Sequence, residues 1–509
     1  MFAFLRAFLR IMREMPPYLS IILAYLLGLT ILNFIRSRRI KSQEQFMVAG
    51  RSLKWQVMVF TLICTWIGSG TFISGAEFAS KAGFSAIWLA AGAWVGIIII
   101  YFLAAKIRTF GQYTVGDMLE ARYGPAARLF GAIALILSFI TIVSYQFLAG
   151  GFILNVITDG KISESTGTII AATFVILFTA LGGMVAIAYT DLPNGIVIVL
   201  ACMLAVPFVV FSAGGVSGAQ AAFAAAHKTG YFDIVNSQFG AHPWLKALGY
   251  FLSTLFLLMG VQSMYQKFYS AKTPGDAKKA VAWWTIGTIF VETVVVVIAV
   301  FAYSKFIDRI DLRIPKAGGK VVLMAARELV PYPVGVLLLG AACAVVLSTG
   351  MNYLLSPSTT VMRDIYQRFM KKGTDEKGLV AMQKVLVVII GVLAYLLATQ
   401  VKSILEMSLF AYTIYGVAIT PALIAALTWK RVTKAGGLAS IISGTVVCVF
   451  FFIMSRVLPP EQVPEGDPWG IPLIYPALIV SLLSLVIVSL MTPRPSEAEM
   501  EKFFPKKAS

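Results

Sequence analysis

The chain alternates long apolar blocks with short polar loops from one end to the other. A helix needs about twenty apolar residues to cross a bilayer, and the blocks have that length. They predict about thirteen membrane-spanning helices, at 17–36, 56–80, 85–106, 128–150, 165–182, 186–213, 244–266, 281–306, 333–358, 379–399, 404–428, 437–457 and 471–491. Arginines interspersed with apolar residues in 1–16 predict an amphipathic segment along the membrane interface. The expected fold class is an all-α polytopic membrane protein.

Composition and charge agree with this pattern. The 509 residues are 59% hydrophobic and 13% charged, and a soluble protein would have no core large enough for the apolar blocks. The net charge of +18 comes from Lys and Arg in short loops. In that position it indicates membrane topology and contact with anionic lipid of the bilayer, and not binding to nucleic acid. The four cysteines lie in apolar blocks without metal-ligand spacing, so we expect no disulfide framework.

The distribution of Lys and Arg also predicts the orientation. Loops after odd-numbered spans carry basic clusters, as in 36–54, 267–279 and 363–377, whereas loops after even-numbered spans are poorer in them. Because basic loops remain in the cytoplasm, we expect the amino terminus outside and the carboxyl terminus inside the cell. The basic segment 1–16 opposes this orientation, but the later loops outweigh it. The expected location is the inner, cytoplasmic membrane of the cell.

Two predicted spans are interrupted by glycine and polar residues. The span 56–80 contains Gly68-Ser69-Gly70, and the span 244–266 is interrupted at 260–263. Glycine weakens a helix and frees backbone carbonyl and amide groups, which the membrane tolerates where they line a cavity. Matched interruptions in two halves of a chain indicate the binding site of a transporter. Close packing of helices through small residues is the alternative.

The interrupted spans each open a set of five helices. Because five is an odd number, the second set must lie inverted in the membrane. We therefore expect five parts: an amino-terminal amphipathic segment with an extra first helix (1–54), a first five-helix repeat (55–213), an outer loop (214–243), a second repeat (244–428), and two further helices with a cytoplasmic tail (429–509).

Two adjacent hydroxyls, those of Ser348 and Thr349, lie inside the apolar run 334–355. A polar group at membrane depth costs free energy, so it usually has a partner or a function. Hydroxyl and free carbonyl oxygens are hard ligands that suit a small, hard cation. Together with the break near Gly68, the pair predicts a cation site deep in the membrane, and hence a transporter.

Several stretches together resemble the sodium:solute symporter family, which includes proline, pantothenate, sugar and choline carriers. The resemblance runs from about residue 46 to residue 434 and is carried by FMVAGRSL at 46–53, YTVGDMLEARYG at 113–124, GGMVA at 182–186 with YTD at 189–191, QK at 266–267 with SAK at 270–272, ST at 348–349 with RDIY at 363–366, and WKRVTKAG at 429–436. It implies a leucine-transporter-like core of five plus five inverted helices. It also implies alternating access driven by the Na+ gradient.

The resemblance further implies the ion ligands. The family's sodium site corresponds to three backbone carbonyls and two hydroxyls, namely those of Cys64, Ile67, Val345, Ser348 and Thr349. Some members of the family use an aspartate that corresponds to Asp191 as a second cation route. Asn352 is its expected neighbour here, although it departs from the small hydroxyl of two-site members. Capping of a helix is the alternative role for Asp191.

The solute is expected between the two breaks, and its candidate contacts are Trp66, Ser69, Thr71, Tyr145, Gln146, Phe147, Gln262, Ser263 and Tyr265, with Tyr412 and Tyr415 as further wall residues. An indole at the break suits an apolar body or a quaternary ammonium. The stretch 65–70 with 74–77 resembles the corresponding helix of the choline carriers, and the stretch 146–151 resembles the pantothenate carriers. A solute of the carboxylate or quaternary amine type is therefore expected. The choline carriers' other cage tryptophan falls at Val261, and the sugar carriers' tyrosine gate falls at Ser263. Packing is the alternative role for each aromatic side chain.

Two carboxyl groups in apolar blocks, those of Glu77 and Glu292, have no assigned function. Glu77 is expected to reach the interface or cap a neighbouring helix. Glu292 is expected to be a structural, neutral carboxyl, with a proton route as the alternative.

Sodium-coupled import of a small organic solute is the function that the sequence favours. Proton coupling through Glu292 or Asp191 is an alternative, and a solute sensor that does not transport is another. We do not expect an enzyme, because the sequence shows no membrane-embedded metal motif or serine–lysine pair. The sequence leaves open the solute, the sodium stoichiometry and the oligomeric state.

Overall fold

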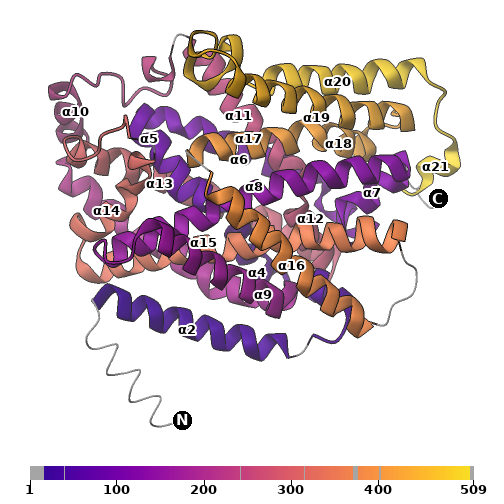
Figure 1. Cartoon of the computed structure of the whole chain (residues 1–509), viewed down its shortest axis with the longest axis horizontal. Helices are drawn as coiled ribbons and strands as arrows, with labels where there is room; N and C mark the ends of the chain where they lie inside the picture. The colour runs from indigo at the N-terminus through magenta and orange to yellow at the C-terminus, as the bar shows by residue number, and fades with distance from the viewer. Residues whose placement is uncertain are drawn as a thin grey trace.

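The computed structural model describes residues 17–38, 40–240, 242–314, 316–370, 376–400 and 403–504. This part of the chain is built from helices and contains no β-strand. Most of the long helices run side by side along the long axis of the molecule (Figure 1). The amphipathic segment predicted at 1–16 lies outside the described residues.

Eleven helices of the described chain are long and apolar enough to cross a membrane. Two of these stretches, Gly70–Phe110 and Glu164–Ser212, each include parts of two predicted spans, which accounts for the difference from thirteen. The long helices are α2 (Pro17–Ser37), α6 (Ile87–Phe110), α8 (Pro125–Ile157), α9 (Glu164–Ser212), α11 (Pro243–Gly260), α13 (Pro274–Phe306), α15 (Tyr332–Thr360), α16 (Glu376–Ala398), α17 (Ile404–Ala418), α19 (Lys434–Val457) and α20 (Ile474–Met491).

Shorter helices complete the bundle. They are α3 (Gln43–Val48), α4 (Trp55–Trp66), α5 (Ala76–Ala82), α7 (Val115–Tyr123), α10 (Gly215–Ala225), α12 (Gln262–Ser270), α14 (Val321–Glu328), α18 (Thr420–Thr428) and α21 (Glu497–Glu501). In Figure 1, α10 and α14 lie at one end of the molecule, and α7 and α21 lie at the opposite end. The predicted outer loop 214–243 therefore carries the short helix α10, at the same end of the molecule as α14.

Gly183 divides α9 at the boundary between two predicted spans. Its φ angle is 49°, in the left-handed region that glycine adopts most readily. A Cβ atom at this position would lie 2.7 Å from the ring of Phe46. The break therefore depends on glycine both for its backbone conformation and for the close packing of α3.

Both predicted helix interruptions are confirmed. Helix α4 ends at Trp66, Ile67 is extended with ψ of 94°, and a wide turn, η2 (Gly70–Gly75), leads into α5. Helices α11 and α12 are separated by Val261, which is extended with ψ of 118°. Both breaks lie within the helical bundle, so their unpaired backbone groups need partners from other helices.

Helix α15 is the centre of the molecule and packs against α8, α9, α4 and α12. Its residues from Leu338 to Thr360 are almost all buried, including its hydroxyl and amide side chains. Helices α19 and α20 form a pair on one side of the bundle, and α2 covers the opposite side (Figure 1). This arrangement places the Ser348-Thr349 pair in the middle of the protein.

Candidate functional site

The hydroxyls of Ser348 and Thr349 face the break after α4. Thr349 Oγ1 lies 2.8 Å from the Cys64 carbonyl and 3.1 Å from the Ile67 carbonyl. Ser348 Oγ lies 3.4 Å from the carbonyls of Cys64 and Val345, and it donates to the Ala344 carbonyl at 2.7 Å. The structure thus brings together all five oxygen atoms that the sequence suggested as ion ligands.

The chemistry of this oxygen set fits a sodium ion. All five atoms are neutral, hard oxygens, and the two hydroxyl-bearing side chains are buried. The extended backbone at Ile67 leaves its carbonyl outside the helical hydrogen-bond pattern and directed at Thr349. A Cβ atom on Gly68 would lie 2.7 Å from the Thr349 methyl group, so glycine permits this close approach.

Side chains from other helices satisfy the broken backbones. Gln146 of α8 accepts a hydrogen bond from the Ser69 amide at 3.1 Å. At the second break, the Tyr415 hydroxyl donates to the Gly260 carbonyl at 2.9 Å and accepts from the Gln262 amide at 3.0 Å. Hydrogen bonds from polar side chains therefore hold each break in a defined geometry.

A buried polar cluster lies directly beside the oxygen set. Asp191 accepts from the Thr61 hydroxyl at 2.5 Å and from the Asn352 amide at 3.1 Å, and Asn352 also donates to the Ser348 carbonyl at 2.8 Å. The ammonium group of Lys267 donates to Asn352 and lies 3.1 Å from the sulfur of Met184. Lys267 was expected among the charges of the loop after the span 244–266, but this expectation is wrong, because it belongs to α12 and is fully buried.

A small cavity adjoins the first break, and we call it the break cavity. Its lining residues are Trp66, Gly70, Thr71, Gly75, Ala86, Leu89, Ala90, Thr254, Glu292, Val295, Val296 and Tyr412. Its volume is about 30 Å³. The rings of Trp66 and Tyr412 are stacked, with centroids 6.5 Å apart. The cavity therefore combines two aromatic rings, a carboxyl group and apolar walls.

The structure separates the nine predicted solute contacts into three groups. Trp66 and Thr71 line the break cavity. A second group does not line the cavity but contacts its surroundings. Its members are Ser69 and Gln146, which are hydrogen-bonded to each other at the break, and Tyr145, whose hydroxyl lies 3.4 Å from the Tyr412 hydroxyl. The remaining four are buried away from the cavity lining, and they are Phe147, Gln262, Ser263 and Tyr265.

Two of these four have structural hydrogen bonds that the sequence did not predict. Gln262 donates to the Thr360 hydroxyl at 2.7 Å and accepts from the Val115 amide at 3.1 Å, so it links α12 to α15 and α7. The Tyr265 hydroxyl donates to the Met259 carbonyl at 2.9 Å across the α11–α12 break. Their polar groups therefore form hydrogen bonds that hold neighbouring helices together.

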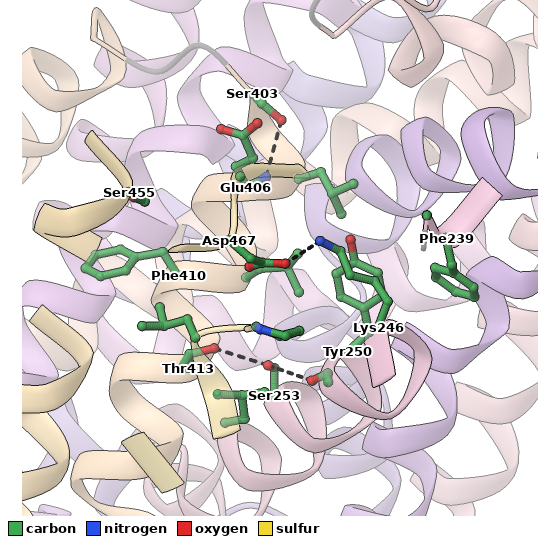
Figure 2. A pocket seen from close by; sticks show the side chains of 18 of the residues that line it. Phe239, Lys246, Tyr250, Ser253, Ser403, Glu406, Phe410, Thr413, Ser455 and Asp467 are labelled. Atoms are coloured by element: carbon green, nitrogen blue, oxygen red, sulfur yellow. Dashed lines mark hydrogen bonds and ion pairs between the residues drawn. The ribbon is translucent and has the colours of Figure 1, made fainter. Parts of the chain in front are cut away.

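A larger pocket of about 580 Å³ lies between α11, α17 and α19 (Figure 2). Lys246 and Asp467 form an ion pair in it, and Ser253 and Thr413 are hydrogen-bonded at 3.1 Å. Thr254 and Tyr412, the sequence neighbours of Ser253 and Thr413, line the break cavity. Helices α11 and α17 thus contribute residues to both spaces.

Arg128 joins three carboxylates near α7. Its guanidinium group lies 2.6 Å from oxygens of Asp117, Glu120 and Asp364, and Arg368 also binds Glu120 at 2.7 Å. Burial raises the pKa of Glu120, but the two guanidinium groups outweigh it and hold the pKa below its ordinary value. The network ties α7 and α8 to the end of the central helix.

Comparisons with known proteins bear on this arrangement. The pattern of the sodium:solute symporter family matches residues 46–444. The chain is 25% identical to the high-affinity proline transporter of Bacillus subtilis, covering 93% of this chain and 98% of that one. It is 26% identical to the sodium/proline symporter of Escherichia coli, with coverage of 96% and 95%. It is 23% identical to the human high affinity choline transporter 1, with coverage of 88% and 79%.

Solved structures agree on the fold. A Na+-coupled sialic acid symporter in a substrate-bound, outward-open state superposes with a TM-score of 0.75 at 16% identity, over 94% of this chain and 99% of that one. MhsT, in complex with L-phenylalanine, superposes with a TM-score of 0.53 at 15% identity, over 85% and 98%. The leucine-transporter-like fold expected from the sequence is thus confirmed. Because the family pattern matches most of its length, the chain belongs to the sodium:solute symporter family.

Proposed function

We propose that this sodium-coupled symporter, which imports a small organic solute, binds its ion between the α4 break and α15. The ligands are the carbonyls of Cys64, Ile67 and Val345 and the hydroxyls of Ser348 and Thr349. The observation that carries the proposal is the position of Thr349 Oγ1, within 3.1 Å of two carbonyl oxygens from another helix. Five neutral oxygens replace part of the water shell of the ion.

The position of the ion explains how it couples to the solute. Sodium bound to both α4 and α15 favours the arrangement in which these helices are close together. That arrangement also orders Trp66 and Thr71, which lie beside the break and line the break cavity. Each ligand therefore increases the affinity for the other, and this reciprocal coupling drives uptake along the sodium gradient.

The solute binds in the break cavity, between Trp66 and the first turn after the break. The relatives of this chain include proline and choline transporters, which supports a solute of the carboxylate or quaternary amine type. The cavity of about 30 Å³ enlarges when the solute enters, as Trp66 and Tyr412 move apart. The larger pocket behind Ser253 and Thr413 is the route of approach.

The buried ammonium group of Lys267 occupies the second cation route at Asp191 and Asn352. It already donates to Asn352, which in turn donates to Asp191. This fixed positive charge takes the place of a second sodium ion, so one sodium accompanies each solute. Replacement of Lys267 by glutamine removes the charge, and the ratio of sodium to solute taken up should rise from about one to about two.

Radioactive sodium and solute fluxes into proteoliposomes measure this ratio. A ratio that stays the same in the Lys267→Gln variant, with uptake preserved, would remove Lys267 from the coupling mechanism. A ratio of two in the unaltered protein would favour a sodium ion at Asp191.

The protein is a multi-pass membrane protein, and we place it in the inner membrane with its amino terminus outside. The end of the molecule that carries α7 and α21 then faces the cytoplasm (Figure 1). The five-part division at residues 54, 213, 243 and 428 remains our interpretation of the two repeats. We assign no catalytic reaction to a member of this transporter family.

The function is tested by uptake of radiolabelled proline and choline into proteoliposomes. We expect accumulation with sodium outside, and none when potassium replaces sodium. Thr349→Ala should raise the sodium concentration required for half-maximal uptake. Uptake that is independent of sodium and is abolished by a protonophore would instead establish proton coupling.

A further inference from the structure

Glu292 lies halfway along α13, with one face towards the break cavity. Its Oε1 accepts hydrogen bonds from Trp66 Nε1 at 2.9 Å and from the Thr71 hydroxyl at 3.4 Å. Its Oε2 accepts from Trp94 Nε1 at 2.7 Å. The side chain is 5% exposed, and it lines the cavity. The carboxyl group is thus held on both sides and presents one edge to the cavity.

The hydrogen bonds around Glu292 suit an ionised carboxylate. An indole N–H can only donate, and each carboxyl oxygen receives such a donor. A protonated carboxyl would have to donate its own proton, and of its three described partners only the Thr71 hydroxyl could accept it. The arrangement therefore stabilises the carboxylate anion.

No cation balances this anion among the residues that the structure describes. None of the ion pairs found there includes Glu292, in contrast to the buried Glu77, which binds Lys81 at 2.9 Å. A buried charge without a partner is expensive, and indole and hydroxyl donors offset only part of its lost hydration. A group that enters the cavity with a positive charge would supply the missing partner.

The other walls of the cavity suit the same group. The stacked rings of Trp66 and Tyr412 present π-electron surfaces, which attract cations, and Val295 and Val296 add apolar surface. A carboxylate beside aromatic rings is a poor environment for an anionic head group.

We propose that Glu292 is the counter-charge for a positively charged nitrogen of the solute, an ammonium or quaternary ammonium group. Trp66 and Tyr412 cover the carbon atoms around that nitrogen, and Trp94 fixes the carboxylate in position. This inference rests on the proposed function, because it specifies the solute class for the same cavity. It also assigns to Glu292 a role other than a proton route.

The test is thermal unfolding of the purified protein with a panel of probes, with and without sodium. Tetramethylammonium, choline, glycine betaine and proline carry a positive nitrogen, whereas pantothenate and glucose do not. We expect at least one of the first four to raise the melting temperature, and neither of the last two. Protection by pantothenate or glucose, or by none of the ammonium compounds, overturns the proposal.

Substitutions separate a binding role from a structural one. Glu292→Gln should weaken the affinity for the protecting ammonium compound by roughly 30-fold or more, because it removes a desolvated charge. Glu292→Asp keeps the charge and should restore part of the affinity if the glutamine variant folds poorly. Glu77→Gln, at a buried carboxyl group outside the cavity, is the matched control and should bind as the unaltered protein does. Equal affinity in the Glu292→Gln variant overturns the proposal.

The same experiment distinguishes this inference from the proposed function. Protection by an ammonium compound that depends on Glu292 but not on sodium would leave the inference standing and remove sodium coupling. Protection that depends on sodium but not on Glu292 would remove the inference about Glu292 and leave sodium coupling standing.

Discussion

At the scale of single residues, the site is built from side chains whose polarity has no other explanation in an apolar helix. Thr349 is the sharpest case, because its hydroxyl bridges two carbonyls of a different helix. Glu292 and Lys267 are similar, since each is a buried charge with partners from helices remote in the sequence. On our proposal, these residues contribute to binding or coupling as well as to packing.

Removal of the Thr349 hydroxyl should weaken sodium binding selectively. Thr349→Val keeps the shape of the side chain but loses one ligand, at a cost of about 1–3 kcal/mol in sodium affinity. The sodium dependence of thermal stability measures this shift. Thr445→Val is the matched control, because that hydroxyl bonds only to the Ile441 carbonyl of its own helix. Similar sodium dependence in both variants would argue against the assigned ligand.

Trp66 should matter more for solute than for sodium. Trp66→Ala removes one ring of the stacked pair and a hydrogen bond to Glu292, but none of the five oxygen atoms. We expect a loss of about tenfold or more in solute affinity, comparable to a desolvated cation–π contact. Binding of the protecting solute, titrated at saturating sodium, measures it. Unchanged solute affinity would reduce Trp66 to a packing residue.

At the scale of elements, the two broken helices create the site, and glycine makes the first break possible. Gly68→Ala would place a methyl group 2.7 Å from Thr349 Cγ2 and 2.9 Å from the Gln146 amide nitrogen. Those side chains would have to move, so the variant should lose sodium-dependent stabilisation. Gly340→Ala on the central helix has no atom within 4 Å and serves as the control. Sodium titrations monitored by melting temperature compare the two. Full sodium response in the Gly68 variant would mean that the break tolerates a side chain.

The sequence could predict the elements because each has a local signal. Apolar length marks the spans, and glycine marks both interruptions, which the structure confirms within a residue or two. The hydroxyl pair at Ser348 and Thr349 was evident because polar groups are rare in such a run. The structure then brought these oxygens to the α4 break, a contact between helices nearly 300 residues apart in the chain.

Other features could not be predicted because they arise only from tertiary packing. Lys267 follows an apolar stretch and precedes a basic loop, so its charge alone gave no sign of burial. Gln262 and Tyr265 lie at the second break, yet their polar groups bind backbone and α15 and do not face the cavity. Trp94 gave no signal in the sequence, since an isolated tryptophan in a span resembles any packing residue.

At the scale of the whole molecule, the Arg128 network holds one end of the bundle together. It joins α7 and α8 to the residues after the central helix through three carboxylates. Arg128→Met would remove the one cation that these three carboxylates share, and we expect a loss of about 3–5 kcal/mol in stability. Thermal unfolding in detergent measures this effect. Arg313→Met is the control, because that arginine is largely exposed. A loss no larger than that of the control would show that the network contributes little.

The same network predicts a response to acid. The pKa of Glu120 is held below its ordinary value in the folded protein, so its ion pairs stabilise the fold above the pKa of the unfolded chain. This stability is lost as the pH falls through the lower, folded value. Glu120→Gln should therefore be less stable at neutral pH and should lose less stability than the unaltered protein in acid. Parallel acid unfolding curves for the two proteins would contradict this assignment.

The central claim is that sodium is held by oxygens from α4 and α15 in the middle of the membrane domain. Equilibrium binding of radioactive sodium to the purified protein tests it most directly, with the double variant Ser348→Ala, Thr349→Val as the comparison. We predict saturable binding to the unaltered protein and none to the double variant at the same concentrations, with both proteins folded. Saturable binding of equal affinity in the double variant would contradict the account.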